Sequence, residues 1–125
     1  MPTQVEHERE AQENAAFFQS LDSGVAMNRK WMVSALFYAA LHWVEALFAH
    51  QLMLHTNSHQ RRERALHRLQ FPLLREYIQL HDASRAGRYQ MVRFSEQDSD
   101  DLFHTCFLPI RNHVLNVLHP PVSTP

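Results

Sequence analysis

The feature that most constrains this chain is a long apolar stretch in its first half. Within residues 33–49, only Ser34, His42 and Glu45 are not apolar. The stretch is too short and carries too many ionisable side chains for a good membrane span, which needs about 20 predominantly apolar residues. It suits a central helix that is buried on most of its sides. We therefore predict one long helix, over about residues 28–54, that the other elements cover.

Helical spacing of apolar residues also predicts helices on both sides of this stretch. The first covers about residues 5–21 and ends at the polar turn 22–24. A third helix begins near Ser58. A fourth runs over about residues 72–86, with a proline at its start and Gly87 at its end.

A last helix is predicted after a run of serines and acids. Ser95 and Ser99 are both followed by acidic residues, as helix N-caps often are. The helix extends to about Leu118, and Pro109 inside it should kink it or split it in two.

Length and composition predict a single all-α domain. The chain has 125 residues, of which 45% are apolar, which is enough for one packed core and too little for two. Only two residues are glycine, which argues against a turn-rich sandwich or barrel. We predict an antiparallel bundle of four to five helices over residues 1–119, followed by a loose tail over residues 120–125.

The single cysteine, Cys106, excludes an internal disulfide and a cysteine-rich zinc site. The first ten residues are polar and acidic, unlike a signal peptide. These features predict a cytoplasmic protein that does not associate with membranes.

Charge is segregated along the chain. Residues 55–95 hold eight arginines against three acids, whereas residues 1–22 and 96–125 are both acidic. Arginine suits bidentate contact with phosphate and stacking on bases. Two interpretations stay open: the acidic ends pair with the basic middle inside one bundle, or the middle forms a phosphate or nucleic-acid surface.

Three polar residues share one face of the central helix. Tyr38, His42 and Glu45 are four and three residues apart. Burying a carboxylate and an imidazole costs several kcal/mol unless they are paired. One interpretation is a hydrogen-bonded core pair, in which Glu45 meets an arginine of a neighbouring helix. The alternative is a metal-binding bundle that uses His42, Glu45 and His59.

Two arginine-rich segments flank the third and fourth helices. Backbone N–H groups at the start of the third helix, together with its first side chains, could hold a phosphate. The segment at the end of the fourth helix could stack on bases. A capping turn with a solvated arginine face is the plainer interpretation of both. The candidate phosphate-binding residues are His59, Arg61, Arg62, Arg85, Arg88 and Tyr89.

The last helix carries a polar cluster that suits ribonuclease chemistry without a metal. Arg111 could stabilise the charge of a phosphorane-like transition state, and a histidine could act as acid or base on a ribose hydroxyl. A partly exposed helix with a polar stripe explains the same pattern without catalysis. The candidate catalytic residues are Arg111, Asn112, His113, Asn116 and His119.

Several of these segments together resemble small HEPN-domain proteins. Residues 34–46, SALFYAALHWVEA, are similar to the motif of their second helix, and Asn57-Ser58-His59 resembles the loop that opens their next helix. Residues 84–89 resemble their R-x-x-x-D-Y stretch, with Arg88 where Asp is usual. Arg111-Asn112 is similar to the start of their ribonuclease motif. The likeness covers roughly residues 28–119.

The resemblance implies a fold and a set of functions. It implies an up-down helical bundle that forms a homodimer, with the Arg/His cluster at a shared cleft. HEPN proteins include metal-independent ribonuclease toxins, often encoded with a nucleotidyltransferase antitoxin, and nucleotide-binding or inactive relatives. In the closest form of the motif, Asn116 occupies the position of the catalytic histidine. Asparagine cannot supply acid–base catalysis, so either His113 or His119 substitutes, or cleavage is lost and binding is kept.

The leading prediction is therefore an RNA- or nucleotide-binding HEPN-type protein of a toxin–antitoxin or defence system, in which ribonuclease activity stays an open question. No cofactor and no resident metal are predicted. The alternatives are a non-catalytic helical dimer that acts as a protein-interaction module, and the metal-binding bundle.

Overall fold

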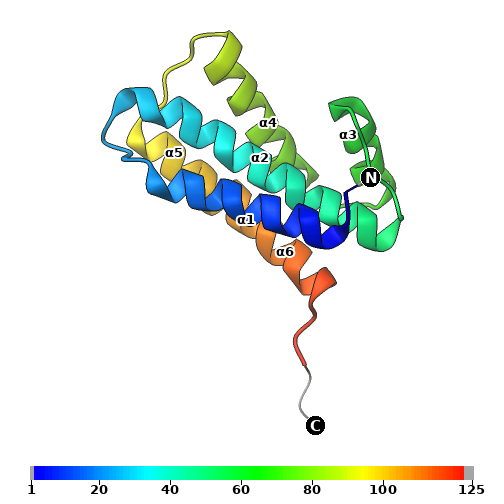
Figure 1. The fold of residues 1–125 in the computed structure, drawn as a ribbon. Coiled ribbons are helices and arrows are strands. Elements are labelled where there is room, and N and C mark those ends of the chain that lie inside the picture. The colour runs from blue at the N-terminus through cyan, green and yellow to red at the C-terminus, as the bar shows by residue number, and fades with distance from the viewer. Residues whose placement is uncertain (1, 123–125) are drawn as a thin grey trace.

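The apolar stretch forms α2, Ala26–Gln51, the helix around which the other elements pack (Figure 1). In the computed structural model, which describes residues 2–122, fifteen of its side chains are buried. Phe37, Val44 and Phe48 are among those fully removed from water. Each such burial stabilises the fold by about 1.5–3 kcal/mol relative to exposure. The predicted central helix is confirmed, with ends shifted by two or three residues.

Helices before and after α2 in the chain cover its faces. α1, Gln4–Ser20, lies along α2, while α4, Leu74–Tyr89, and α6, Leu108–Leu118, pack against other sides of it (Figure 1). The short α3, His59–Arg68, lies beside α4. No strand occurs among residues 2–122, so the all-α prediction is confirmed for that part of the chain.

The helix starts follow capping rules. Thr3 and Glu6 form a capping box at the start of α1, and the Ser58 hydroxyl accepts the Arg61 N–H at the start of α3. α5, Glu96–Leu102, begins at Ser95 rather than Ser99. Ser99 lies inside α5, where its hydroxyl donates to the Glu96 carbonyl.

The last helix changes its hydrogen-bonding pattern shortly before its proline. A π-helical turn, Phe103–Phe107, connects α5 directly to α6, so that the chain stays helical throughout. In this turn, the Leu108 N–H donates to the Phe103 carbonyl. Pro109 lies in the first turn of α6, where its missing N–H is tolerated. The described residues thus form five helical segments, within the predicted four to five.

The prediction that Gly87 ends the fourth helix was wrong. Gly87 lies inside α4, which continues to Tyr89. A Cβ atom at this position would lie 2.8 Å from Cε2 of Phe94. Gly87 therefore allows the segment after α4 to fold back closely onto the helix. The turn itself is made by Met91, whose φ is 57°.

The length and hydropathy of α2 pass a simple test for a membrane span, but its most apolar 18-residue window is 83% buried inside the protein. Burial in the core accounts for this hydropathy. At the other end, α6 stops at Leu118 and residues 120–122 are not helical. The rest of the predicted tail, residues 123–125, lies outside the described residues.

Candidate functional site

Glu45 is a buried carboxylate whose surroundings come from three parts of the chain. Its side chain is 1% exposed. One oxygen, Oε1, accepts the Arg62 Nε–H of α3 at 2.9 Å and the Thr56 hydroxyl. The other, Oε2, accepts the Thr56 backbone N–H at 3.1 Å and lies 3.4 Å from Nδ1 of His55. The prediction that Glu45 meets an arginine of a neighbouring helix is confirmed.

This ion pair fixes α3 against the core. The segment between α2 and α3 returns Thr56 to Glu45, and Thr56 is itself buried. Arg62 is also buried, and removing one partner of such a pair leaves an uncompensated charge in the interior, at a cost of about 3–5 kcal/mol. The first turns of α3 are therefore held in a fixed position relative to α2.

A group of arginine and histidine side chains lies next to this pair. Arg62 Nη1 donates to Nδ1 of His59 over 3.1 Å, and the His59 ring lies 4.2 Å from the His81 ring. Burial lowers the pKa of His59, and the charges of His81, Arg62, Arg88 and Arg85 lower this pKa further. We call His59, Arg62, His81, Arg85 and Arg88 the basic cluster.

Arg88 is held between two tyrosines. Its Nη1 donates to the Tyr38 hydroxyl over 2.8 Å, and its Nε donates to the Ser84 carbonyl over 3.3 Å. The guanidinium lies 5.5 Å from the Tyr38 ring centroid and 5.2 Å from that of Tyr89. Tyr89 is 74% exposed. Arg88 is thus pre-positioned beside an aromatic ring that faces solvent.

Only some side chains of the basic cluster have a carboxylate partner. Glu45 pairs with Arg62, and Glu63 lies 3.6 Å from Nδ1 of His81. Within residues 2–122, neither Arg85 nor Arg88 forms an ion pair with a carboxylate. Five of the six predicted phosphate-binding residues lie in or beside the basic cluster: His59, Arg62, Arg85, Arg88 and Tyr89. Arg61 is exposed and contacts Asn57.

The predicted catalytic residues of α6 make contacts in different directions. Arg111 donates twice to Oδ1 of Asn112, His113 packs edge-on against Phe71, and the exposed His119 pairs with Glu8 at 2.7 Å. Asn116 is exposed. Among the contacts of the described residues, none joins Arg111 to a histidine.

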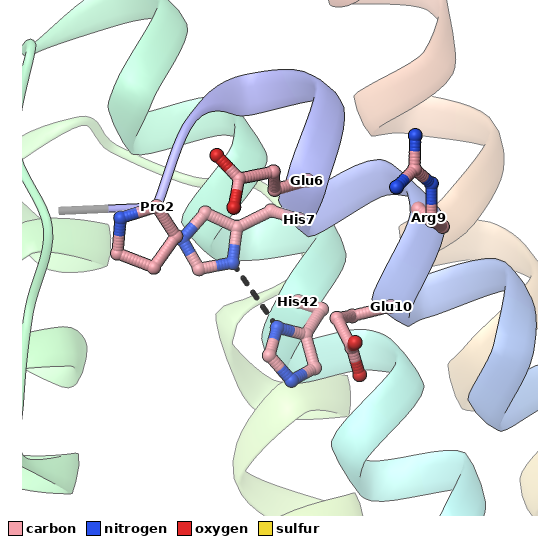
Figure 2. Close-up of a pocket in the computed structure, with 6 residues that line it drawn as sticks. All are labelled: Pro2, Glu6, His7, Arg9, Glu10 and His42. Carbon is pink, nitrogen blue, oxygen red and sulfur yellow. Dashed lines mark hydrogen bonds between the residues drawn. The ribbon is translucent and has the colours of Figure 1, made fainter.

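A second histidine group was missed by the sequence analysis. His7 Nδ1 lies 3.1 Å from His42 Nδ1, and His7 Nε2 lies 3.3 Å from His55 Nδ1. Burial lowers the pKa of both His7 and His42. Figure 2 shows His7 of α1 facing His42 of α2, joined by this contact. Both rings line a hollow of about 240 Å³ that is also lined by Glu6, Arg9 and Glu10.

This grouping corrects the ligand set of the alternative interpretation, the metal-binding bundle. Of His42, Glu45 and His59, only Glu45 belongs to the group of residues whose ligand atoms come together, which consists of His7, Glu45 and His55. His59 contacts Arg62 instead. The signal for His7 was its helical register, because it lies four residues before the fully buried Ala11 on the face of α1 that meets α2.

The chain matches no protein-family model, no curated protein and no solved structure. The resemblance to the HEPN family therefore stays a prediction.

Proposed function

We propose that this protein binds a phosphate-bearing ligand, RNA or a nucleotide, at the basic cluster. The observation that carries the proposal is the placement of Arg88 between Tyr38 and Tyr89, beside Arg85, with no carboxylate partner for either arginine. An arginine that is positioned but not neutralised is suited to bind an anion from outside.

The neighbouring groups favour a phosphate attached to a base. The exposed Tyr89 ring offers a face on which a base can stack, and such stacking is worth about 1–3 kcal/mol per base. His59 and His81 offer imidazole groups at the same site. Phosphate contact and aromatic stacking together are typical of single-stranded RNA recognition.

The same proposal places the chain in the HEPN family as an antiparallel, up-down bundle and a cytoplasmic homodimer, with binding kept rather than cleavage. We favour binding because Asn116 stands where the HEPN motif has its catalytic histidine, and asparagine cannot supply acid–base catalysis. Membership of a toxin–antitoxin or defence system, with a nucleotidyltransferase as partner, rests on the resemblance alone.

A mobility-shift assay with a mixed RNA pool in EDTA tests the proposal, with ATP as a competitor that separates nucleotide from RNA binding. We expect Arg85→Gln and Arg88→Gln each to weaken RNA binding and to reduce its salt dependence, because each removes a phosphate contact. Arg9→Gln removes the same charge from α1 and should leave the affinity within about twofold.

Two results would contradict the proposal. Equal affinities for wild type and both α4 variants would remove the basic cluster as the binding site. Loss of binding in Arg111→Ala with normal binding in Arg88→Gln would move the site to α6. Cleavage of RNA in EDTA that disappears in Arg111→Ala would show instead that ribonuclease activity is kept.

A further inference from the structure

Three potential metal ligands from distant parts of the chain converge beside the N-terminus of α1. They are His7 of α1, Glu45 of α2 and His55 of the segment that follows α2, and one ligand atom of each lies within 4.8 Å of the others. His55 Nδ1 lies between the other two, 3.3 Å from His7 Nε2 and 3.4 Å from Glu45 Oε2.

The two separations from His55 Nδ1 match the geometry of a zinc site. Zinc binds imidazole nitrogen and carboxylate oxygen at about 2.0–2.2 Å, in a tetrahedral arrangement. Two ligand atoms on a tetrahedron of that size are about 3.3–3.5 Å apart, since an edge is about 1.63 times the centre-to-vertex distance. Both separations from His55 fall in this range, and the ligand atoms of His7 and Glu45 lie within 4.8 Å of each other.

We propose that His7 Nε2, His55 Nδ1 and Glu45 Oε2 bind one zinc ion, with a fourth position left for water. Two histidines and one glutamate are a ligand set that zinc sites with an open position use. None of the three ligands belongs to the basic cluster, although Arg62 of that cluster donates to the other oxygen of Glu45.

The groups around the ligands support this assignment. When Nε2 of His7 binds a metal, its Nδ1–H can donate to His42 Nδ1, which lies 3.1 Å away. A partner of this kind fixes the tautomer and the ring orientation of a ligating histidine. The carboxylate is oriented in the same way, by Arg62 and Thr56 on Oε1 and by the Thr56 N–H on Oε2.

The local charge and access also suit a cation. Arg62 opposes a metal ion, but Glu45 compensates it directly. The hollow beside His7 and His42 is lined by two acids, Glu6 and Glu10, against one cation, Arg9 (Figure 2). The His55 side chain is 31% exposed, so an ion can reach the site from solvent.

Titration calorimetry with zinc chloride on the chelator-dialysed full chain tests the site. We expect one zinc ion per chain in wild type. Replacing an outer partner of a metal ligand commonly costs 10–100-fold in affinity, so His55→Ala, which removes a ligand, should cost more than about 100-fold. His42→Ala should fall in the 10–100-fold range. The matched control is His104→Ala, whose side chain is 57% exposed and lies 3.4 Å from Asp100.

The proposal is overturned if wild type binds no zinc, if His55→Ala keeps wild-type affinity, or if His104→Ala loses as much affinity as His55→Ala. Circular dichroism of the metal-free variants checks that they fold. If His55→Ala does not fold, Co²⁺ bound to wild type gives the second measurement: strong visible bands of a tetrahedral ion support the site, and the weak bands of an octahedral ion overturn it. Because RNA binding is assayed in EDTA, failure of either proposal leaves the other unaffected.

Discussion

At the scale of single residues, Arg62 links the buried carboxylate to the basic cluster. It donates to Glu45 through Nε and to His59 through Nη1. Arg62→Met should therefore destabilise the protein by about 3–5 kcal/mol, because Glu45 stays buried without its cation. Urea unfolding measures this change in the free energy of unfolding.

The neighbouring Arg61 gives a matched control. Arg61 is exposed and makes only a long contact with Asn57, so Arg61→Met should change the stability by no more than about 0.5 kcal/mol. Similar losses in the two variants would mean that the ion pair with Glu45 does not stabilise the fold.

His59 gives a prediction of pH dependence. Its pKa is lowered below the ordinary value of about 6.5, first by burial and then by His81, Arg62, Arg88 and Arg85. The folded state therefore prefers neutral His59, and the unfolded state binds protons more readily. Stability from this residue is present above pH 6.5 and is lost as the pH falls below it.

The expected result is a decrease in melting temperature on acidification from pH 7.5 to about 5 that is smaller in His59→Gln. The amide oxygen of glutamine can still accept from Arg62 but does not titrate. A wild type and a variant with parallel pH profiles would show that His59 is not held in its neutral form.

Folding lowers the pKa of His59, and binding of a phosphate ligand should raise it again. A phosphate beside His59 favours the imidazolium, so binding at the basic cluster should couple to proton uptake. We expect the RNA affinity of wild type to increase between pH 7.5 and 6, and that of His59→Gln to increase less. An affinity that decreases over this range in fluorescence anisotropy would place His59 outside the binding site.

At the scale of elements, the contact between Gly87 and Phe94 determines how α4 meets the following segment. Alanine is favoured over glycine in a helix by about 1 kcal/mol, so an unhindered Gly87→Ala would stabilise α4. Here the new Cβ would lie 2.8 Å from the Phe94 ring, and overpacking of this kind costs about 1–3 kcal/mol. We expect net destabilisation in thermal unfolding.

A second substitution tests whether the Phe94 ring causes the destabilisation by Gly87→Ala. Phe94→Leu removes the ring atoms that the new Cβ meets, so the Gly87→Ala change should be less costly in that background than in wild type. Equal costs in both backgrounds would exclude the ring contact as the source of the effect.

The elements also show what a sequence can and cannot predict. The helices were predictable because apolar spacing, caps and prolines are local signals, and Ser58 and Pro109 both lie at helix starts. The role of Gly87 was not predictable. Glycine is needed there because the Phe94 ring packs against the helix, and the position of that ring depends on tertiary folding. The π turn at Phe103–Phe107 likewise has no distinctive local pattern.

The candidate sites also combine features that the sequence predicts with features that it does not. An arginine partner for Glu45 was predictable, since a buried carboxylate needs a cation. The convergence of His7 and His55 on Glu45 was not, because it depends on how α1 docks on α2 and on the path of the segment that precedes α3. That path includes Met53, whose φ is 49°. Helical register places His7 on the inner face of α1, but sequence spacing does not show which residues it meets there.

At the scale of the whole molecule, the question is which surface a second copy would cover. α2 is the most apolar helix of the chain, and α1, α4 and α6 already cover most of it. What remains exposed is its first turns, where Met27 is 64% and Trp31 48% exposed. Exposed apolar residues of this size are typical of protein contacts when they lie close together.

On this observation, we expect a homodimer to form through the start of α2 rather than through the α6 cleft that the HEPN resemblance implies. Trp31→Glu places a charge in that contact and should yield a monomer, whereas Phe17→Glu, which alters an equally exposed aromatic residue of α1, should stay dimeric. Sedimentation equilibrium of the full chain measures both. Helix content by circular dichroism should be unchanged in each variant, since neither side chain is buried in the core. A monomeric wild type would contradict the homodimer, and a dimeric Trp31→Glu would place its interface elsewhere on the molecule.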